Sequence, residues 1–539
     1  MSTREIITLQ FGHYANFVGA HWWNLQEGNF SYDSSKPSEI NHDVLYREGQ
    51  NPKREVTFTP RLLSVDLKGS LGYLSEHGNL YEDDSPSDPD SMCLWNSDNI
   101  EITKEEKLPK APFIQSLEDN ATNNEKVEFE FEDEVDSWVD YVVPRFHPRT
   151  INIVKEYKHN DNDKKFDIYN YGKNLWQTEK FQDDFSDKIR AYAEECDLMQ
   201  GFQVLMDCTD GFGGLGSSCI EHLNDEYGKS ILTFPLIDST INEPSINDLI
   251  KSLNIALSWQ KIGECSSIYS PLCCSEEGWS PKTPRKFENI SYNQNSKYHT
   301  SAILATALDT LSIRYRHKSY PSSALSDLCA DMNKQGRKAA AMSLSLPFPM
   351  TAKKDLIDIL DDMETSLWTS LTPNCEISGE RNMQSFSLRG IPEDRLKRPM
   401  IDARKQMGKP AYSCKTVHEM MTMYLAYSCH ASATYLTNTT QPLKIDTPYP
   451  KIFKNNLHEN GDVADWPVGE TVKTIPVMAG LHSTSEMSKM FESLHDRVSK
   501  IKNIKKFHAF GDAGLEQDDL AECLNHLLDT KESFEENYV

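Results

Sequence analysis

Two glycine-containing segments have the residue types and spacing that bind phosphate in α/β proteins. The first starts as an apolar run at residues 6–11 and passes through Gly12 into a helical pattern. The second is the glycine-rich run at residues 210–218, which also follows an apolar run. A strand that enters a helix through glycine directs backbone N–H groups and the positive end of the helix dipole at one point. Each segment therefore predicts a place where an anion could be held.

The glycine-rich run allows two interpretations. Its backbone amides at Gly211, Gly213, Gly214 and Gly216 and the hydroxyls of Ser217 and Ser218 at the start of a helix could hold a phosphate. The competing interpretation, which we favour, is that the glycines only allow a tight turn from strand to helix. Asp210 supports this choice, because a carboxylate within a few ångströms of a phosphate costs about 1 to 4 kcal/mol.

The elements that must position these segments are short apolar runs typical of strands buried on both faces of a parallel sheet. They lie at residues 6–11, 62–67, 202–206 and 231–237. Between the second and third runs, residues 185–196 repeat apolar side chains at helical spacing, as a crossover between parallel strands requires. The first half of the chain is therefore predicted to be a doubly wound α/β domain, over residues 1–295.

The second half predicts a long buried helix and a smaller α/β domain. Residues 296–317 are apolar nearly all round, which is typical of a helix buried between layers, and we assign residues 296–337 to this helix and its connection. A second α/β domain is expected over residues 338–508, with a helix that begins at Ser483 and has a capping box with Glu486. A C-terminal helix with an acidic tail is expected over residues 509–539.

Residues 81–140 are expected to be an acidic insertion. Residues 81–98 are rich in Asp, Ser and Pro, and residues 118–140 alternate Glu with aromatic and aliphatic side chains up to Trp138. We interpret residues 81–98 as a surface loop and residues 118–140 as a solvated linker. The alternative is a docking segment that adds a strand or helix to a partner.

Composition excludes several classes of function. The formal net charge of −26 disfavours binding to nucleic acid and to anionic lipid. No apolar run is long enough to span a bilayer, and the first residues resemble neither a secretory signal nor an Arg-rich mitochondrial presequence. The twelve cysteines show no paired C-x-x-C spacing, so we expect reduced thiols and no metal site.

The order of these elements, together with Val65-Asp66-Leu67, resembles the tubulin/FtsZ superfamily. The opening run through His13 and Tyr14, Ser137-Trp138 with His147-Pro148-Arg149, and the altered glycine run resemble the Misato family of tubulin-like proteins over nearly the whole chain. This resemblance implies a tubulin-like fold and a role in mitochondrial distribution and morphology. It also implies links to the spindle and to tubulin-folding chaperonin complexes.

The resemblance also implies a vestigial GTP pocket. It places in that pocket Gly12, His13, Tyr14, Asp66, Gly211, Gly213, Gly214, Gly216 and Ser217. Tubulins have Gly-Gln-Cys-Gly where this chain has Gly12-His13-Tyr14-Ala15, so an imidazole and a bulky phenol replace an amide and a small side chain. Aligning Tyr298 with the start of the central helix puts Ala302 where tubulins use an Asn to read guanine.

The acidic hydrolysis loop of the superfamily corresponds to residues 321–331, where only Asp327 could serve as the acid, and we expect it to be a solvated helix residue. Polymerisation is therefore not expected. We favour a non-catalytic scaffold without a cofactor, and we expect a cytoplasmic protein attached peripherally to the cytosolic face of mitochondria. The alternatives are a GTP-binding switch or slow GTPase, and a polymer-forming cytoskeletal subunit.

Overall fold

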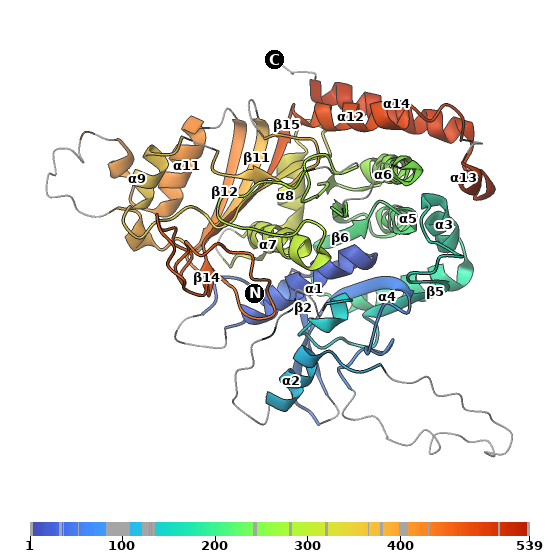
Figure 1. Cartoon of the computed structure of the whole chain (residues 1–539), viewed down its shortest axis with the longest axis horizontal. Coiled ribbons are helices and arrows are strands. Elements are labelled where there is room, and N and C mark those ends of the chain that lie inside the picture. The colour runs from blue at the N-terminus through green and yellow to red at the C-terminus, as the bar shows by residue number, and fades with distance from the viewer. Residues whose placement is uncertain are drawn as a thin grey trace.

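The four apolar runs expected to be strands all form strands of one parallel sheet in the computed structural model. The sheet has six strands in the order β5-β4-β1-β6-β7-β8 (Figure 1). The strands are β1 (Ile6–Phe11), β4 (Leu62–Lys68), β5 (Ile151–Lys158), β6 (Gly201–Asp207), β7 (Ser230–Leu236) and β8 (Ile268–Tyr269). Nearly all residues of β1, β4, β6 and β7 are buried, which explains why their sequences are continuously apolar.

The structure describes residues 4–535 except for 32–34, 36, 52, 82–107, 121–128, 130, 132–134, 241–244, 280–282, 319–321, 365, 378–380, 398–407, 409, 429–430 and 505–506.

The register of the central strands brings three chain positions together at the carboxyl edge of the sheet. β1 lies between β4 and β6, and Phe11 is paired with Val65 on one side and with Met206 on the other. The residues that follow these partners are Gly12, Asp66 and Asp207. In open parallel α/β sheets, ligands bind at this edge.

Helices cover both faces of this sheet. One hydrophobic cluster contains side chains of α1 (His13–Gly28) and of α7 (Lys297–Arg316), the long helix that was expected from its sequence. A second cluster contains side chains of the helices on the opposite face. These are α3 (Tyr169–Trp176), α4 (Glu179–Glu194), α5 (Gly211–Tyr227) and α6 (Ile246–Cys265). The predicted doubly wound arrangement is confirmed.

A second sheet follows α7 in the chain and packs on the other side of that helix (Figure 1). It is mixed, with the strand order β10-β9-β15-β11-β12, and only β11 and β12 run parallel. Its strands are β9 (Ala341–Ser345), β10 (Thr369–Ser370), β11 (Arg381–Arg389), β12 (Ala431–Thr439) and β15 (Val477–Thr484). Nearby helices are α8 (Leu325–Met332), α9 (Leu356–Asp361) and α11 (Val417–Ser428).

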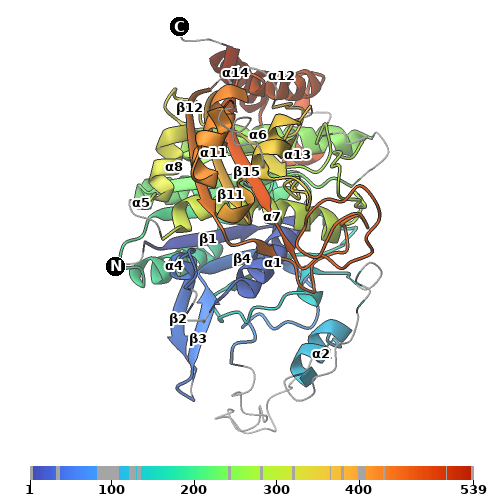
Figure 2. The same cartoon turned by 90° about the vertical axis from the view of Figure 1, so that its left-hand side faces the viewer.

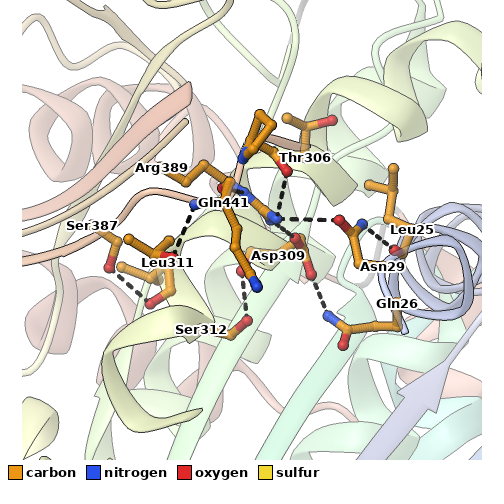
Figure 3. Close-up of polar contacts among 12 residues, drawn as sticks. Leu25, Gln26, Asn29, Thr306, Asp309, Leu311, Ser312, Ser387, Arg389 and Gln441 are labelled. Carbon is orange, nitrogen blue, oxygen red and sulfur yellow. Dashed lines mark hydrogen bonds and ion pairs between the residues drawn. The ribbon is translucent and has the colours of Figure 1, made fainter. Parts of the chain in front are cut away.

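A buried ionic network joins the two halves of the molecule across α7 (Figure 3). Asp309 of α7 accepts hydrogen bonds from Arg389 of β11 at 2.5 Å and from Arg316 at 3.1 Å. Gln26 of α1 also donates to Asp309. Both arginines and the aspartate are buried, so Asp309 compensates part of the arginines' positive charge inside the protein, away from water. The network therefore fixes the first sheet's α1 and the second sheet's β11 to the same helix.

The C-terminal part differs from expectation at the start of one helix. Ser483 was predicted to begin a helix, but it lies in β15, and α12 spans Met487–Val498. β15 is buried and paired with both β9 and β11, so sheet pairing overrides the local capping pattern. α13 (His508–Asp512) and the predicted C-terminal helix α14 (Gln517–Glu535) complete the chain's regular structure, and α14 lies beside α12 (Figure 1).

The interpretation of residues 118–140 as a solvated linker is wrong for the part that the structure describes. Phe131 is buried and its ring lies 5.7 Å from that of Tyr298 on α7. Trp138 is also buried, and it begins a short 3₁₀ turn at Trp138–Asp140. The aromatic residues of this acidic segment therefore anchor it to the fold. Most of the Asp-, Ser- and Pro-rich run at residues 81–98 lies outside the described residues.

Small elements lie around the two sheets. The hairpin of β2 (Tyr46–Gln50) and β3 (Val56–Pro60) and the helix α2 (Pro112–Asn120) extend from the lower side of the first sheet (Figure 2). β13 (Leu443–Lys444) pairs with β14 (Thr474–Ile475). Within the described ranges, no helix has both the length and the apolar character needed to cross a membrane. The cysteines placed in the structure are free thiols, and most of them are buried.

Candidate functional site

The N-terminus of α1, predicted as a phosphate site, is occupied by a carboxylate of the chain itself. Asp207, at the end of β6, accepts hydrogen bonds from the backbone N–H of Tyr14 at 2.9 Å and of Ala15 at 2.8 Å. Gly12 has a φ of 113°, and a Cβ atom there would lie 2.3 Å from Asp207 Oδ2. Gly12 is therefore needed for the close approach of this carboxylate, not for the approach of a phosphate.

The N-terminus of α5, the second predicted phosphate site, is also filled from within. Asp210 caps the helix and accepts a hydrogen bond from Phe212 N–H at 2.9 Å. Gly211 N–H donates to the Phe166 carbonyl at 3.0 Å, and Gly213 N–H donates to the Asp210 carbonyl at 3.1 Å. The first three N–H groups of the helix therefore have protein partners, so none of them is available to an anion.

The glycines of this run lie inside the helix, which corrects the expectation of a loop or a flexible turn. α5 begins at Gly211. A Cβ atom added to any of the glycines in this run would lie tightly against a neighbouring residue. A Cβ on Gly214 would lie 1.8 Å from the Tyr169 carbonyl oxygen of α3, and one on Gly213 would lie 2.4 Å from Ser258 Oγ of α6. Gly216 packs against Met206. These residues allow close helix packing.

Ser217 and Ser218 were expected at the helix N-terminus, but they lie in its second turn. Ser217 is fully buried beside Tyr169 of α3. Ser218 Oγ donates to the Gly214 carbonyl of its own helix at 2.9 Å. Neither hydroxyl therefore points to the site at which a phosphate would meet the helix dipole.

Burial raises the pKa of both carboxyl groups at the sheet edge. Burial, and after it the charge of Asp210, raise the pKa of Asp207 well above its ordinary value. Burial raises the pKa of Asp210 to about 7, although the hydrogen bond from Phe212 acts in the opposite direction. Lys297, which lies 3.7 Å from Asp238, supplies a partly compensating positive charge. A phosphate would add further negative charge to this acidic environment.

A buried amide holds the segment that covers the start of α5. Asn254 of α6 accepts a hydrogen bond from Tyr169 N–H at 2.9 Å and donates to the carbonyls of Asp167 and Thr209, each at 2.8 Å. The ring of Phe166 packs edge-on against that of Phe212, 5.1 Å away. The covering segment is therefore part of the packed fold.

The side of the site where tubulins read the base is filled by side chains. Tyr14 is buried, and its hydroxyl donates to Thr300 Oγ1 of α7 at 3.0 Å. Ala302 is also buried and offers no side-chain hydrogen bond, as the alignment predicted. Tyr14 thus serves as a contact between α1 and α7.

His13 and Asp66 do come together, in a cluster that includes a residue the sequence analysis did not identify. His13 is the first residue of α1, and its Nδ1 lies 3.2 Å from Asp66 Oδ2 at the end of β4. His159 follows β5, and its ring centroid lies 4.1 Å from that of His13. Asp66 Oδ2 also accepts a hydrogen bond from Trp138 Nε1 at 2.9 Å.

Burial and the nearby ring nitrogens determine the charges of this cluster. Burial alone would raise the pKa of Asp66, but the charge and hydrogen bond of His13, with bonds from Leu67 N–H and Trp138, lower it instead. Burial and the neighbouring His13 lower the pKa of His159 to about 4. A carboxylate thus lies beside a neutral imidazole at neutral pH.

Asp327 is an exposed helix residue, as expected. Asp327 is exposed in the first turn of α8, and its carboxylate accepts a hydrogen bond from Ala324 N–H at 2.7 Å. It therefore acts as a helix cap. Of residues 321–331, only residue 321 lies outside the described residues.

Asp207 and His159 were missed because their roles depend on the sheet register. Asp207 directly follows the apolar run at residues 202–206, and an acid at the carboxyl end of a buried parallel strand was a signal that could have been used. His159 follows β5, whose second half is mostly exposed and which was not predicted as a strand. No spacing in the sequence joins His159 to His13.

Comparisons with known proteins agree with the fold. A family described as the Misato Segment II tubulin-like domain matches residues 4–119, and one described as a tubulin domain matches residues 130–317. The chain is 34% identical to "Protein misato" of Drosophila melanogaster over 99% of this chain and 98% of that protein. It is 33% identical to "Protein misato homolog 1" of Mus musculus over the same shares. It is 35% identical to "Protein DML1" of Phaeosphaeria nodorum over 71% of this chain and 73% of that protein.

Proposed function

The chain belongs to the Misato family of tubulin-like proteins, and from this membership we propose that it is a non-catalytic scaffold in mitochondrial distribution and morphology. It acts through its surface and not through a nucleotide cycle. The same surface role extends to the spindle and to the handling of tubulin. Its partners are proteins of the tubulin or chaperonin machinery.

One observation supports the non-catalytic role above the others. The helix N-termini that would hold the phosphates of a nucleotide hold Asp207 and Asp210 instead. Each carboxyl group accepts hydrogen bonds from N–H groups that a phosphate would need, and Asp210, whose pKa is about 7, would also repel that phosphate in its ionised form. The protein gains helix capping from these carboxylates, and nucleotide binding would require both to move.

The proposed attachment to mitochondria is peripheral and depends on a protein receptor. The net charge of −26 opposes direct binding to anionic lipid headgroups. The described part of the chain has no helix suited to crossing the bilayer. These properties therefore favour attachment through a protein on the cytosolic face of the outer membrane.

Cell fractionation combined with depletion tests this role. We expect part of the endogenous protein to sediment with mitochondria and to be released by alkaline carbonate, which removes peripheral proteins. Depletion should change the distribution of mitochondria, and re-expression of the wild-type chain should restore it. An unchanged mitochondrial network after complete depletion would overturn the proposal, and resistance to carbonate would contradict the peripheral attachment.

A measurement of phosphate release separates the scaffold from a slow GTPase. Purified protein with GTP and Mg²⁺ should release phosphate no faster than a buffer blank. Release that scales with protein concentration, and that persists in an independently purified preparation, would contradict the non-catalytic role.

A further inference from the structure

Three side chains from separate parts of the chain converge at the carboxyl edge of the first sheet. His13 begins α1, Asp66 lies near the end of β4, and His159 follows β5. One nitrogen or oxygen atom from each of them lies within 4.8 Å of the atoms from the other two. The sequence analysis expected no metal site, because it considered cysteine spacing and not this juxtaposition.

Two imidazoles and one carboxylate are a donor set that binds divalent transition metals. Ligand atoms bonded to one such ion at about 2.1 Å lie roughly 3 to 3.5 Å apart. The 3.2 Å separation between His13 Nδ1 and Asp66 Oδ2 already has this value. His159 needs only a small movement of its side chain, and it lies in a turn after the strand where a side chain can adjust.

The carboxylate of the cluster is oriented by fixed neighbours. Asp66 Oδ2 accepts hydrogen bonds from Trp138 Nε1 at 2.9 Å and from Asn16 Nδ2 at 3.2 Å, and Oδ1 accepts one from Leu67 N–H at 2.8 Å. Partners of this kind fix a metal-binding carboxylate in place and contribute to affinity. The neighbouring His159 is held at its backbone, where its N–H donates to the Lys68 carbonyl at 2.9 Å.

The cluster lies where an ion could enter from solvent. The side chain of Asp66 is 1% exposed, whereas that of His13 is 12% exposed. His159 is also partly exposed. An ion would therefore contact the buried carboxylate on one side and the two imidazoles and water on the other.

We propose that His13, Asp66 and His159 form a binding site for a divalent transition metal ion, with zinc as the ion to test. Imidazole nitrogen favours such ions over Mg²⁺ and Ca²⁺, which take oxygen ligands. The three protein ligands leave a coordination position for water or for a ligand of a partner. The bound ion ties the start of α1 to β4 and to the turn after β5.

Metal titration of the purified full-length chain tests this site. The protein is stripped with a chelator, freed of it by gel filtration and titrated with Zn²⁺ against a fluorescent chelator. We expect one equivalent to bind, and His159→Gln to weaken binding at least tenfold. His77→Gln is the matched control, since His77 is an exposed histidine, and it should bind as the wild type does.

Co²⁺ identifies the ligands independently of zinc affinity. Ligation by imidazole and carboxylate gives visible absorption without the thiolate charge-transfer bands that cysteine ligation would add, which separates this site from the chain's cysteines. Trp138→Phe should weaken binding about tenfold because it removes one hydrogen bond to Asp66. Binding that is unchanged in His159→Gln and in a correctly folded His13→Gln, or a thiolate spectrum, would overturn the proposal.

Discussion

Two carboxyl groups determine the chemistry of the sheet edge at the residue scale. Asp207 caps α1 and Asp210 caps α5. The pKa of both carboxyl groups is raised. A protonated carboxyl group still offers an oxygen that accepts a backbone hydrogen bond. The capping function therefore persists over a wide pH range, while the charge of Asp210 changes near neutral pH.

Asp210→Asn should make the protein more stable at alkaline pH. The pKa of Asp210 is about 7 in the folded protein, above its ordinary value of 3.8, so the folded state binds more protons between these pH values. This group therefore lowers the free energy of unfolding as pH rises through that range. Asn keeps the capping oxygen without the charge, so we expect a gain of up to about 4 kcal/mol at pH 8 and almost none at pH 4.

Urea unfolding at pH 4 and pH 8 measures this difference. The control is Asp197→Asn, at an exposed position, which should leave the pH dependence as it is in the wild type. Equal pH dependence of Asp210→Asn and the wild type would show that Asp210 does not carry a raised pKa.

The packing of α5 against α3 is the feature that matters at the element scale. Gly214 and Gly172 face each other's helices, and a Cβ on either would lie 1.8 Å from a backbone oxygen of the partner helix. The sequence pattern of closely spaced glycines is shared by phosphate loops and by close helix contacts. Only the position of α3 shows which of the two applies here.

Gly214→Ala should destabilise the protein although alanine favours helix. The two helices would have to separate to admit the new methyl group, and overpacking of this kind costs about 1 to 3 kcal/mol. The melting temperature should fall by several degrees. Gly511→Ala is the control, because no atom lies within 4 Å of its added Cβ, and it should be neutral or slightly stabilising. A Gly214→Ala protein that melts with the wild type would contradict the packing account.

The network around Asp309 connects the two sheets at the scale of the whole molecule. Asp309 lies on α7 and contacts Arg389 from the second sheet and Gln26 from α1 (Figure 3). All three side chains are buried. A buried charge that loses its partner is expensive, so the network contributes to the specific orientation of the two halves.

Arg389→Met should lower the free energy of unfolding by roughly 1.5 to 3 kcal/mol, because it removes a charge-assisted hydrogen bond to Asp309 while Arg316 still compensates the charge of the aspartate. Equilibrium urea unfolding measures the loss, and the two halves should then separate into distinct transitions. Lys353→Met removes one partner of the exposed pair with Asp465 and should change stability by less than about 1 kcal/mol. Similar effects of the two substitutions would contradict a special role for the network.

Most of the first sheet could be predicted because its strands are buried on both faces and are therefore continuously apolar, as residues 6–11 and 202–206 show. Ser483 was misassigned because pairing with two neighbouring strands outweighs a local capping pattern. Phe131 and Trp138 were assigned to a solvated linker because their acidic neighbours are typical of an exposed segment, although both side chains are buried. The site residues His13 and Asp66 could be named in advance, but Asp207 and His159 depend on long-range register.

Titration with a fluorescent GTP analogue in the presence of Mg²⁺ tests the central claim most directly. Displacement of the bound analogue by unlabelled GTP establishes specificity. Because Asp207 and Asp210 occupy the helix N-termini, we expect no saturable GTP binding with a dissociation constant below about 100 μM, which corresponds to a binding free energy of roughly 5 to 6 kcal/mol. Saturable binding below that concentration, displaced by unlabelled GTP, would contradict it.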